Sequence, residues 1–489
     1  MERLLLQGVR VSLDAEQLLK EYEKNDKILD KLINLNKAFL AKEDVELIIA
    51  ELKKEEQEKA AEAMIPSETE VKRNPDFKAI ASEYSADIKI NHTRDVTGKS
   101  RTTGEVDDFI SYFRSRYEKL SKLLRTPSKY PTVNANDARR HVGEKAKIII
   151  LVNEVTKTKK GNVMIQGEDM TGQVRAIVSP SNGKEKIFEK AGLILLDDVL
   201  AITGKMLEQY MIVDDIEWPD MPITRERKLT ENDLASVYLS DIHFGSRYFL
   251  EKYFELFTEW IKGRGDRPDL ASKVKYVVIA GDIVDGIGIY PNQEKELILK
   301  DVGKQYNMFD DFVSRLPDYI EVIIAPGNHD AVRRGEPMPC IGKDLIKSDV
   351  TSVGNPCTVT IEGLKHLVYH GTSIDSIIAT LPNMSYNHPE KVMLEYLKRR
   401  HLSTIYGGNL IIPEKIDYMA LEEEPDVLHC GHVHKNGYAL YRGTVVINSG
   451  TFQDRTEFQV KQGHIPTPAI VPVYEMKTGR LTTLDFKSG

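Results

Sequence analysis

Cysteine is scarce in this sequence. The 489 residues contain three cysteines, Cys340, Cys357 and Cys430, and no CxxC pair. Three cysteines cannot all pair with one another, which excludes a disulfide framework, and their wide spacing excludes a cysteine-based zinc finger. This usage is typical of a reducing cytoplasm, which is the compartment that we expect for the protein.

Long hydrophobic runs are also lacking. No apolar stretch approaches the ~18 residues that a membrane span needs. The first residues, MERLLLQGVRVSLDAEQ, have neither the apolar core nor the small-residue cleavage site of a signal peptide. Hydrophobic residues make up 41% and charged residues 29% of the chain, which is typical of a soluble globular protein without membrane contact.

The third feature that is lacking is an excess of positive charge. The formal net charge is −8, whereas a protein that binds DNA on its own is usually basic. The charge weighs against tight autonomous DNA binding, but not against an enzyme whose DNA is held by a partner. A cluster of metal-binding carboxylates would also add negative charge that bound cations offset.

The chain is long enough for about three folded units. Apolar residues recur at helical spacing through residues 1–62, which predicts a helical domain that either only packs or also docks a partner. Residues 63–135 are predicted to be a linker with one helix, at 107–124. Within this linker the polar stretch 91–107 is expected to be flexible.

Residues 136–222 change to the alternation of β-structure. The pattern predicts five strands and, between the third and fourth, one helix, at 145–155, 162–169, 173–179, 184–192 (the helix), 198–206 and 209–218. This order is that of an OB-fold barrel. OB-folds often bind single strands through aromatic residues on a basic groove. Here the strands carry few aromatics, mainly Tyr210, so a structural or subunit-contact role and nucleic-acid contact both stay open.

Residues 232–489 predict a layered α/β domain. Short buried strands alternate with helices, and each strand ends in a polar cluster, as in ASVYLSD, KVKYVVIAGD, EVIIAPGNHD, HLVYHG, PDVLHCGHVH and TVVINSG. Active sites of layered α/β folds collect at such strand ends.

Five of these strand ends carry residue types that bind metals. They are Asp241 with His243, Asp282, Asn328 with His329 and Asp330, His370, and His432 with His434. Four of the clusters lie roughly 40 residues apart, enough for a strand, a helix and a return. The ligands can therefore converge at one edge of a sheet. Five other histidines lack this context and are expected to be structural or surface residues: His366, His388, His401, His429 and His464.

The residue types match the needs of phosphodiester cleavage. Near pH 7 the reaction requires a nucleophile stronger than water and shielding of the phosphate charge, and two divalent ions ~3.5–4 Å apart supply both. A mixed nitrogen and oxygen donor set suits manganese, iron or zinc better than magnesium or calcium alone. On an extended segment, a period of two would place Asp241 and His243 on the same side. We therefore expect a site for two divalent ions, with manganese favoured.

This ordered set resembles the calcineurin-like metallophosphoesterase superfamily over roughly residues 235–450. The resemblance implies that one metal has the ligands Asp241, His243, Asp282 and His434, with Asp282 bridging, and that the second has Asn328, His370 and His432. It also implies that His329 protonates the leaving oxygen and contacts the phosphate. Asp330 is placed to orient His329.

A barrel followed by such a domain resembles the B-subunits of replicative polymerases. Four stretches are similar to the small subunits of archaeal D-family DNA polymerases: SDIHFGSRYF, GDIVDGIGIYPNQ, VMLEYLKRRHLSTIYGG and TFQDRTEFQVKQGHIPTP. The resemblance implies a 3′-to-5′ exonuclease that degrades single-stranded DNA and proofreads for a large catalytic subunit, in a heterodimer or larger assembly that binds primer-template DNA. Eukaryotic B-subunits have eroded metal motifs, whereas here no ligand is missing.

Two other functions stay open. One is a non-catalytic scaffold that holds the polymerase subunit, and the complete ligand set argues against it. The other is a phosphatase of the same superfamily, and the barrel and the polymerase-like stretches argue against it. The loop after Asp285, which contains Tyr290 and Gln293, is expected either to line the DNA path or to pack on the barrel.

Overall fold

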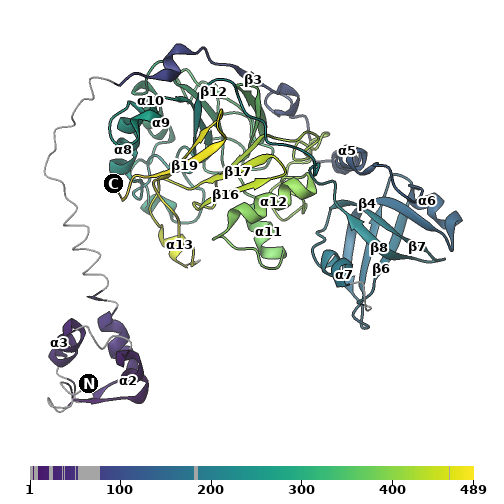
Figure 1. The fold of residues 1–489 in the computed structure, drawn as a ribbon, viewed down its shortest axis with the longest axis horizontal. Helices are drawn as coiled ribbons and strands as arrows, with labels where there is room; N and C mark the ends of the chain where they lie inside the picture. Colours follow the sequence, from purple (N-terminus) through teal and green to yellow (C-terminus); the bar gives the residue numbers. More distant parts are fainter. Residues whose placement is uncertain are drawn as a thin grey trace. The chain divides into compact units, whose positions relative to one another are not determined.

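The fold is described from a computed structural model, in which residues 4, 9–20, 26–35, 37, 39–49, 51–52, 77–180, 185–461 and 463–488 are described. The chain divides into two compact units, Met1–Arg73 and Asn74–Gly489, which Figure 1 shows together. Within the described residues, no helix is both long and apolar enough to span a bilayer.

The first unit is built from short helices around a small apolar core. Helices α2 (Leu13–Lys20) and α3 (Asp26–Asn34) and the helical residues 42–49 bury side chains such as Leu19 and Val45. A two-stranded parallel sheet of β1 (Arg10–Val11) and β2 (Phe39–Leu40) accompanies them. Strands of two residues are too short to carry an alternating pattern, so the sequence did not predict them. The end of the predicted helical domain, residues 53–62, lies outside the described residues.

The second unit contains a closed five-stranded barrel. Its strands are β4 (Lys145–Lys157), β5 (Val163–Glu168), β6 (Gln173–Val178), β7 (Val199–Met206) and β8 (Met211–Glu217), in the closed order β4-β5-β6-β8-β7. Helix α7 (Glu185–Ala191) lies between β6 and β7, so the prediction of five strands with a helix between the third and fourth is confirmed. The short helix α6 (Ala135–Ala138) precedes the barrel.

Strand β4 explains the unbroken apolar run in the sequence. Ile148 and Ile150 face the barrel interior, whereas Ile149 and Leu151 pack against helix α5 (Val106–Leu124) outside it. Both faces of the strand are buried, so the alternation of a half-exposed strand disappears.

The rest of the unit is a sandwich of two six-stranded sheets. One sheet has the order β12-β11-β10-β9-β18-β19, with β9 (Ala235–Leu239), β10 (Val274–Ala280), β11 (Glu321–Ala325), β12 (Thr351–Ser352), β18 (Ile470–Glu475) and β19 (Arg480–Asp485). The other has the order β16-β17-β15-β14-β13-β3, with β3 (Ile88–Ile90), β13 (Cys357–Ile361), β14 (Leu364–Val368), β15 (Val427–Cys430), β16 (Asn436–Tyr441) and β17 (Thr444–Ser449).

Helices cover both outer faces of the sandwich, which gives four layers (Figure 1). In β10, Val277 and Ile279 pack with the helices of one outer layer, while Val278 and Ala280 face the other sheet. The outer helices are α8 (Glu251–Ile261), α9 (Pro268–Ala271) and α10 (Val302–Ser314) on the first sheet, and α11 (Ile374–Thr380) and α12 (Pro389–Arg399) on the second. Strands β9, β10 and β11 are parallel, so their carboxyl ends meet at one edge.

The polar stretch 91–107, predicted to be a flexible linker, is instead attached to the sandwich. Just before it, β3 pairs with β13 and completes the second sheet. The buried carboxylate of Asp95 accepts a hydrogen bond from the backbone N–H of Gly354 at 3.0 Å, and Arg94 donates to the carbonyl oxygen of Ala420 at 2.9 Å. Polar side chains are used here for hydrogen bonds with the domain, which composition alone cannot distinguish from solvation.

Helix α5 joins the barrel to the sandwich through a buried ion pair. Arg116 is fully buried, and its Nε donates to Asp417 Oδ2 at 2.9 Å. The same guanidinium donates to the carbonyl oxygens of Thr404 in the sandwich and Asp197 beside the barrel, at 2.6 and 3.3 Å. Asp417 also lies 2.8 Å from His401 Nε2. These contacts connect α5 to the sandwich and to the segment beside the barrel.

We expect Arg116→Ala to lower the free energy of unfolding of the second unit by ~3–5 kcal/mol, because it leaves Asp417 buried without its cation. Denaturant unfolding followed by circular dichroism measures the change. Arg114→Ala, which removes an exposed arginine from the same helix, serves as the matched control. Equal stability of the two variants would contradict the role of the pair.

Candidate active site

Seven predicted ligands lie at the ends of five strands. Asp241 and His243 follow β9, Asp282 follows β10, Asn328 follows β11, His370 follows β14, and His432 and His434 follow β15. The predicted proton donor His329 lies beside Asn328. The structure brings all of these side chains together where the carboxyl ends of strands from both sheets meet.

The ligand-bearing segments are not extended, contrary to the prediction for Asp241 and His243. Both residues have positive φ, 50° and 56°, as does Asp282, 51°. Their backbone is held by neighbouring strand ends, because Asp241 N–H donates to the carbonyl of Gly281 and His243 N–H to that of Asp282, at 2.9 and 3.1 Å. Left-handed backbone is uncommon for residues other than glycine and is concentrated at functional sites.

Glycines beside the ligands serve two purposes. Gly281 and Gly371 have φ of +83° and +112°, as expected for sharp turns. Gly327 and Gly431 instead provide space. A Cβ atom at Gly327 would overlap Asp282 Oδ1, and one at Gly431 would overlap Asp241 Oδ2.

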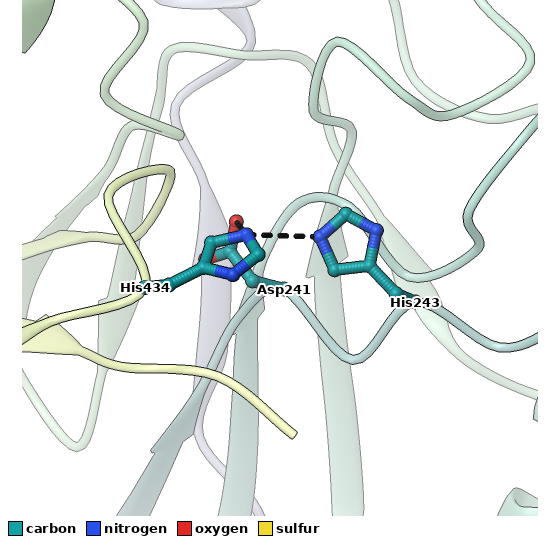
Figure 2. Close-up of side chains that lie close together, drawn as sticks. All are labelled: Asp241, His243 and His434. Atoms are coloured by element: carbon teal, nitrogen blue, oxygen red, sulfur yellow. Dashed lines mark hydrogen bonds and ion pairs between the residues drawn. The ribbon is translucent and has the colours of Figure 1, made fainter. Parts of the chain in front are cut away.

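Three ligand atoms converge in the first cluster, formed by Asp241, His243 and His434. Figure 2 shows the two imidazoles facing each other, with the carboxylate of Asp241 beside His434. The Nε2 atoms of the two histidines lie 3.1 Å apart, and His434 Nε2 lies 3.4 Å from Asp241 Oδ1. All three side chains are buried.

Asp282 lies between this cluster and a second one. Its Oδ2 atom is 3.9 Å from His243 Nε2 and 3.3 Å from His370 Nε2. Asn328 Oδ1 is 3.0 Å from the same nitrogen of His370. Asp282 therefore faces histidines of both clusters.

His432 approaches the second cluster from the other side. Its ring centre is 5.2 Å from that of His370, and its Nε2 lies 3.0 Å from Asp375 Oδ2. When Nε2–H donates to this carboxylate, Nδ1 is the nitrogen left to bind a metal. Asp375 is on α11, and the sequence did not single it out because no strand-end motif contains it.

Asp285 is a further residue that sequence reasoning missed. Its buried Oδ1 lies 2.9 Å from His243 Nδ1, and its carbonyl oxygen accepts from His329 Nδ1 at 2.8 Å. Both histidines therefore direct Nε2 toward the site. The signal was a second aspartate three residues after Asp282 in GDIVD. Gln459, on α13 (Glu457–Lys461), contacts His434 Nδ1 at 2.8 Å and has no comparable signal.

Asp330 has a different place from the one predicted. Its buried carboxylate accepts from the backbone N–H of Gly327 at 2.8 Å and from the hydroxyl of Tyr306 at 3.1 Å. It thereby holds the loop that presents Asn328 and His329. The carbonyl of Asp285 orients the imidazole of His329 instead.

The electrostatics of the site attract cations. Burial alone would lower the pKa of His370, but Asp282 and Asp241 outweigh burial and raise this pKa to about 10. Burial opposes ionisation of Asp282, yet His370 and His329 hold its pKa well below the usual value. Concentrated carboxylates and imidazoles of this kind could hold divalent metal ions.

A cleft of about 640 Å³ opens over these residues. Ile289 and Tyr290 line it, together with Tyr386 and His464. His464, expected to be structural or on the surface, is therefore part of the site's surroundings. Gln293 is buried and donates to the carbonyl of Asp285, so Tyr290 and not Gln293 contributes to the cleft.

Known proteins resemble the chain over most of its length and over the site. The family model described as calcineurin-like phosphoesterase matches residues 237–436. The chain is 39% identical to the DNA polymerase II small subunit of Archaeoglobus fulgidus, over 97% of this chain and 95% of that protein. The subunits of the same name from Methanocaldococcus jannaschii and Methanothermobacter thermautotrophicus are 39% and 37% identical, over 82% and 86% of this chain and 69% and 85% of theirs.

We expect Asp285→Asn to lower the affinity for Mn²⁺ ~10- to 100-fold, because His243 loses the carboxylate that fixes its ring and tautomer. Isothermal titration of metal-free protein with Mn²⁺ measures the effect. Asp311→Asn, at an exposed position on α10, is the control. An unchanged affinity in Asp285→Asn would contradict the orienting role.

Proposed function

Because the chain belongs to the family of DNA polymerase II small subunits, we propose that it is the 3′-to-5′ exonuclease of a two-subunit replicative DNA polymerase. The observation that carries this proposal is the convergence of Asp241, Asp282 and the other predicted ligands at the cleft that His329 lines. A subunit that served only as a scaffold would have no need for a complete set of ligands, five of which are buried.

The residues of the cleft suit the cleavage of a terminal phosphodiester. Bound divalent ions would activate a water molecule and neutralise phosphate charge. We assign them, as the resemblance implies, to Asp241, His243, Asp282 and His434 for one ion and to Asn328, His370 and His432 for the other, with Asp282 shared. A pair of manganese ions is expected, with iron and zinc as alternatives.

His329 is proposed to move the proton. Its Nδ1 donates to the carbonyl of Asp285, so the ring cannot turn freely, and its Nε2 lies 4.0 Å from Asp282 Oδ2 at the cleft. Because Nδ1 keeps its proton for the carbonyl of Asp285, Nε2 carries a proton only when the ring is an imidazolium. In that form Nε2 can donate its proton to the 3′ oxygen that leaves when the last nucleotide is released. Asp330 supports this step by holding the loop of His329.

The other parts of the chain are proposed to serve assembly. The barrel order and the place of α7 support an OB-fold over residues 136–222, before a phosphoesterase domain over 232–489. We propose that this OB-fold and a helical domain over 1–62 contribute contacts with a large catalytic subunit. Single-stranded or primer-template DNA would then reach the cleft within the complex.

The direct test is Mn²⁺-dependent digestion of a 5′-labelled single-stranded oligonucleotide. We expect a ladder that shortens from the 3′ end and is absent with Asp282→Ala, which excludes a contaminating nuclease. No cleavage with or without the large subunit would favour a scaffold. Hydrolysis of p-nitrophenyl phosphate with an intact oligonucleotide would favour a phosphatase.

We expect His329→Ala to reduce cleavage by ~10²- to 10⁴-fold while both metals stay bound, because the substitution removes a proton donor and no ligand. Cleavage rates and elemental analysis of the same preparation measure the two effects. His141→Ala, in a part-exposed turn before the barrel, is the control. Loss of metal from His329→Ala would contradict this assignment.

A further inference from the structure

The cleft is larger than a phosphate group and two ions need. Its volume of about 640 Å³ lies in the ~300–1,000 Å³ range of clefts that enclose a whole small molecule. Besides the predicted ligands, its lining includes Ala379 of α11 and two aromatic side chains, Tyr386 and His464. We call this pair the aromatic wall.

The two rings of the aromatic wall contact each other and line the cleft. The two ring centres are 5.2 Å apart with planes tilted by 56°, and the side chain of Tyr386 is 37% exposed. His464 is positioned by its backbone N–H, which donates to the carbonyl of Gln459 at 2.9 Å. Thr467 N–H donates to the carbonyl of His434 at 2.9 Å, so the loop of His464 is tied to a predicted metal ligand.

Charge limits what the wall can bind. Among the described residues that line the cleft, none is a lysine or arginine. Sites for single-stranded DNA usually combine a basic groove with aromatic rings on which bases stack. With no basic side chain in the cleft, attraction for a DNA strand beyond the reacting phosphate has to come mainly from ring stacking. His464 adds a ring whose buried Nε2 has no hydrogen-bond partner in the described part of the chain.

We propose that the aromatic wall of Tyr386 and His464 is a nucleobase-binding subsite that stacks the unpaired 3′-terminal base of the DNA strand. This proposal rests on the proposed exonuclease function. It adds the feature of the substrate that the enzyme would recognise, which is a terminal base that has left the duplex. A terminal nucleotide without a base would lose this contact and keep the phosphate contacts.

A second role of Tyr386 has to be separated from stacking. Its hydroxyl interacts with Asp375, the carboxylate that contacts His432. Removal of the whole side chain could therefore disturb a metal ligand. Tyr386→Phe removes only the hydroxyl and keeps the ring, so the two substitutions distinguish the roles.

The test compares KM and kcat of the full chain for two 5′-labelled oligonucleotides, one ending in a normal nucleotide and one in an abasic deoxyribose. We expect Tyr386→Ala to raise KM for the normal strand ~5- to 150-fold, the range that loss of one stacked base implies. Tyr386→Phe should stay near wild type. For the abasic strand, wild type and Tyr386→Ala should have the same, higher KM. Phe39→Ala, at an exposed aromatic of the first unit, is the control.

Two outcomes would overturn the subsite. One is an equal KM of wild type and Tyr386→Ala for the normal strand. The other is identical behaviour of Tyr386→Ala and Tyr386→Phe with a lower Mn²⁺ affinity in both by calorimetry, which would assign Tyr386 to positioning Asp375.

A DNA-binding measurement distinguishes failure of the exonuclease proposal from failure of the subsite. If wild type cleaves neither strand, fluorescence anisotropy with the same oligonucleotides and Mn²⁺ still measures the subsite. Tighter binding of the normal strand that Tyr386→Ala abolishes would support the subsite without the nuclease. Equal binding of both strands would overturn it.

Discussion

The buried carboxylate of Asp282 is the constraint around which the site is arranged. A carboxylate taken out of water is costly unless it is paired and hydrogen-bonded. Oδ1 accepts from the backbone N–H of His329 at 2.8 Å, and Oδ2 faces the imidazoles of His370 and His243. These partners come from both sheets of the sandwich. The two sheets must therefore end at the same point, and the left-handed backbone of Asp282 and the absence of a side chain at Gly327 follow from the same crowding.

Strand-end chemistry was readable in the sequence because it is local. Each apolar run is followed at once by its ligand, and parallel strands place these ends at one edge. Asp375 and Tyr386 follow no such rule. They come from α11 and the loop after it, whose position depends on packing against the second sheet. The predicted role of Asp330 was wrong for a related reason, because residues adjacent in sequence need not hydrogen-bond to each other. The carboxylate of Asp330 accepts from the backbone N–H of Gly327 and not from His329.

Amino-acid composition was the least reliable basis for predicting the structure of the segments between the domains. The polar residues of 91–107 look like a linker, yet Asp95 and Arg94 use their polarity to bind loops of the sandwich. Arg116 of α5 was equally hard to single out in the sequence. An isolated charge on an amphipathic helix is usually solvated, and only the fold shows that Arg116 meets Asp417 with no exposed surface. Long-range ion pairs have no sequence period, so their partners cannot be found without the structure.

The scarcity of positive charge in the cleft has a consequence for selectivity. A duplex end approaches a basic groove whatever its sequence, because phosphate contacts carry no information about pairing. The cleft is instead lined by side chains of the types that bind metals and by the aromatic wall of Tyr386 and His464. A terminal base must leave its neighbours to stack there, and unstacking costs least for a mismatched base. On the proposed function, the preference for an error would then come from the DNA itself, while the proposed subsite would bind the base that has left its neighbours.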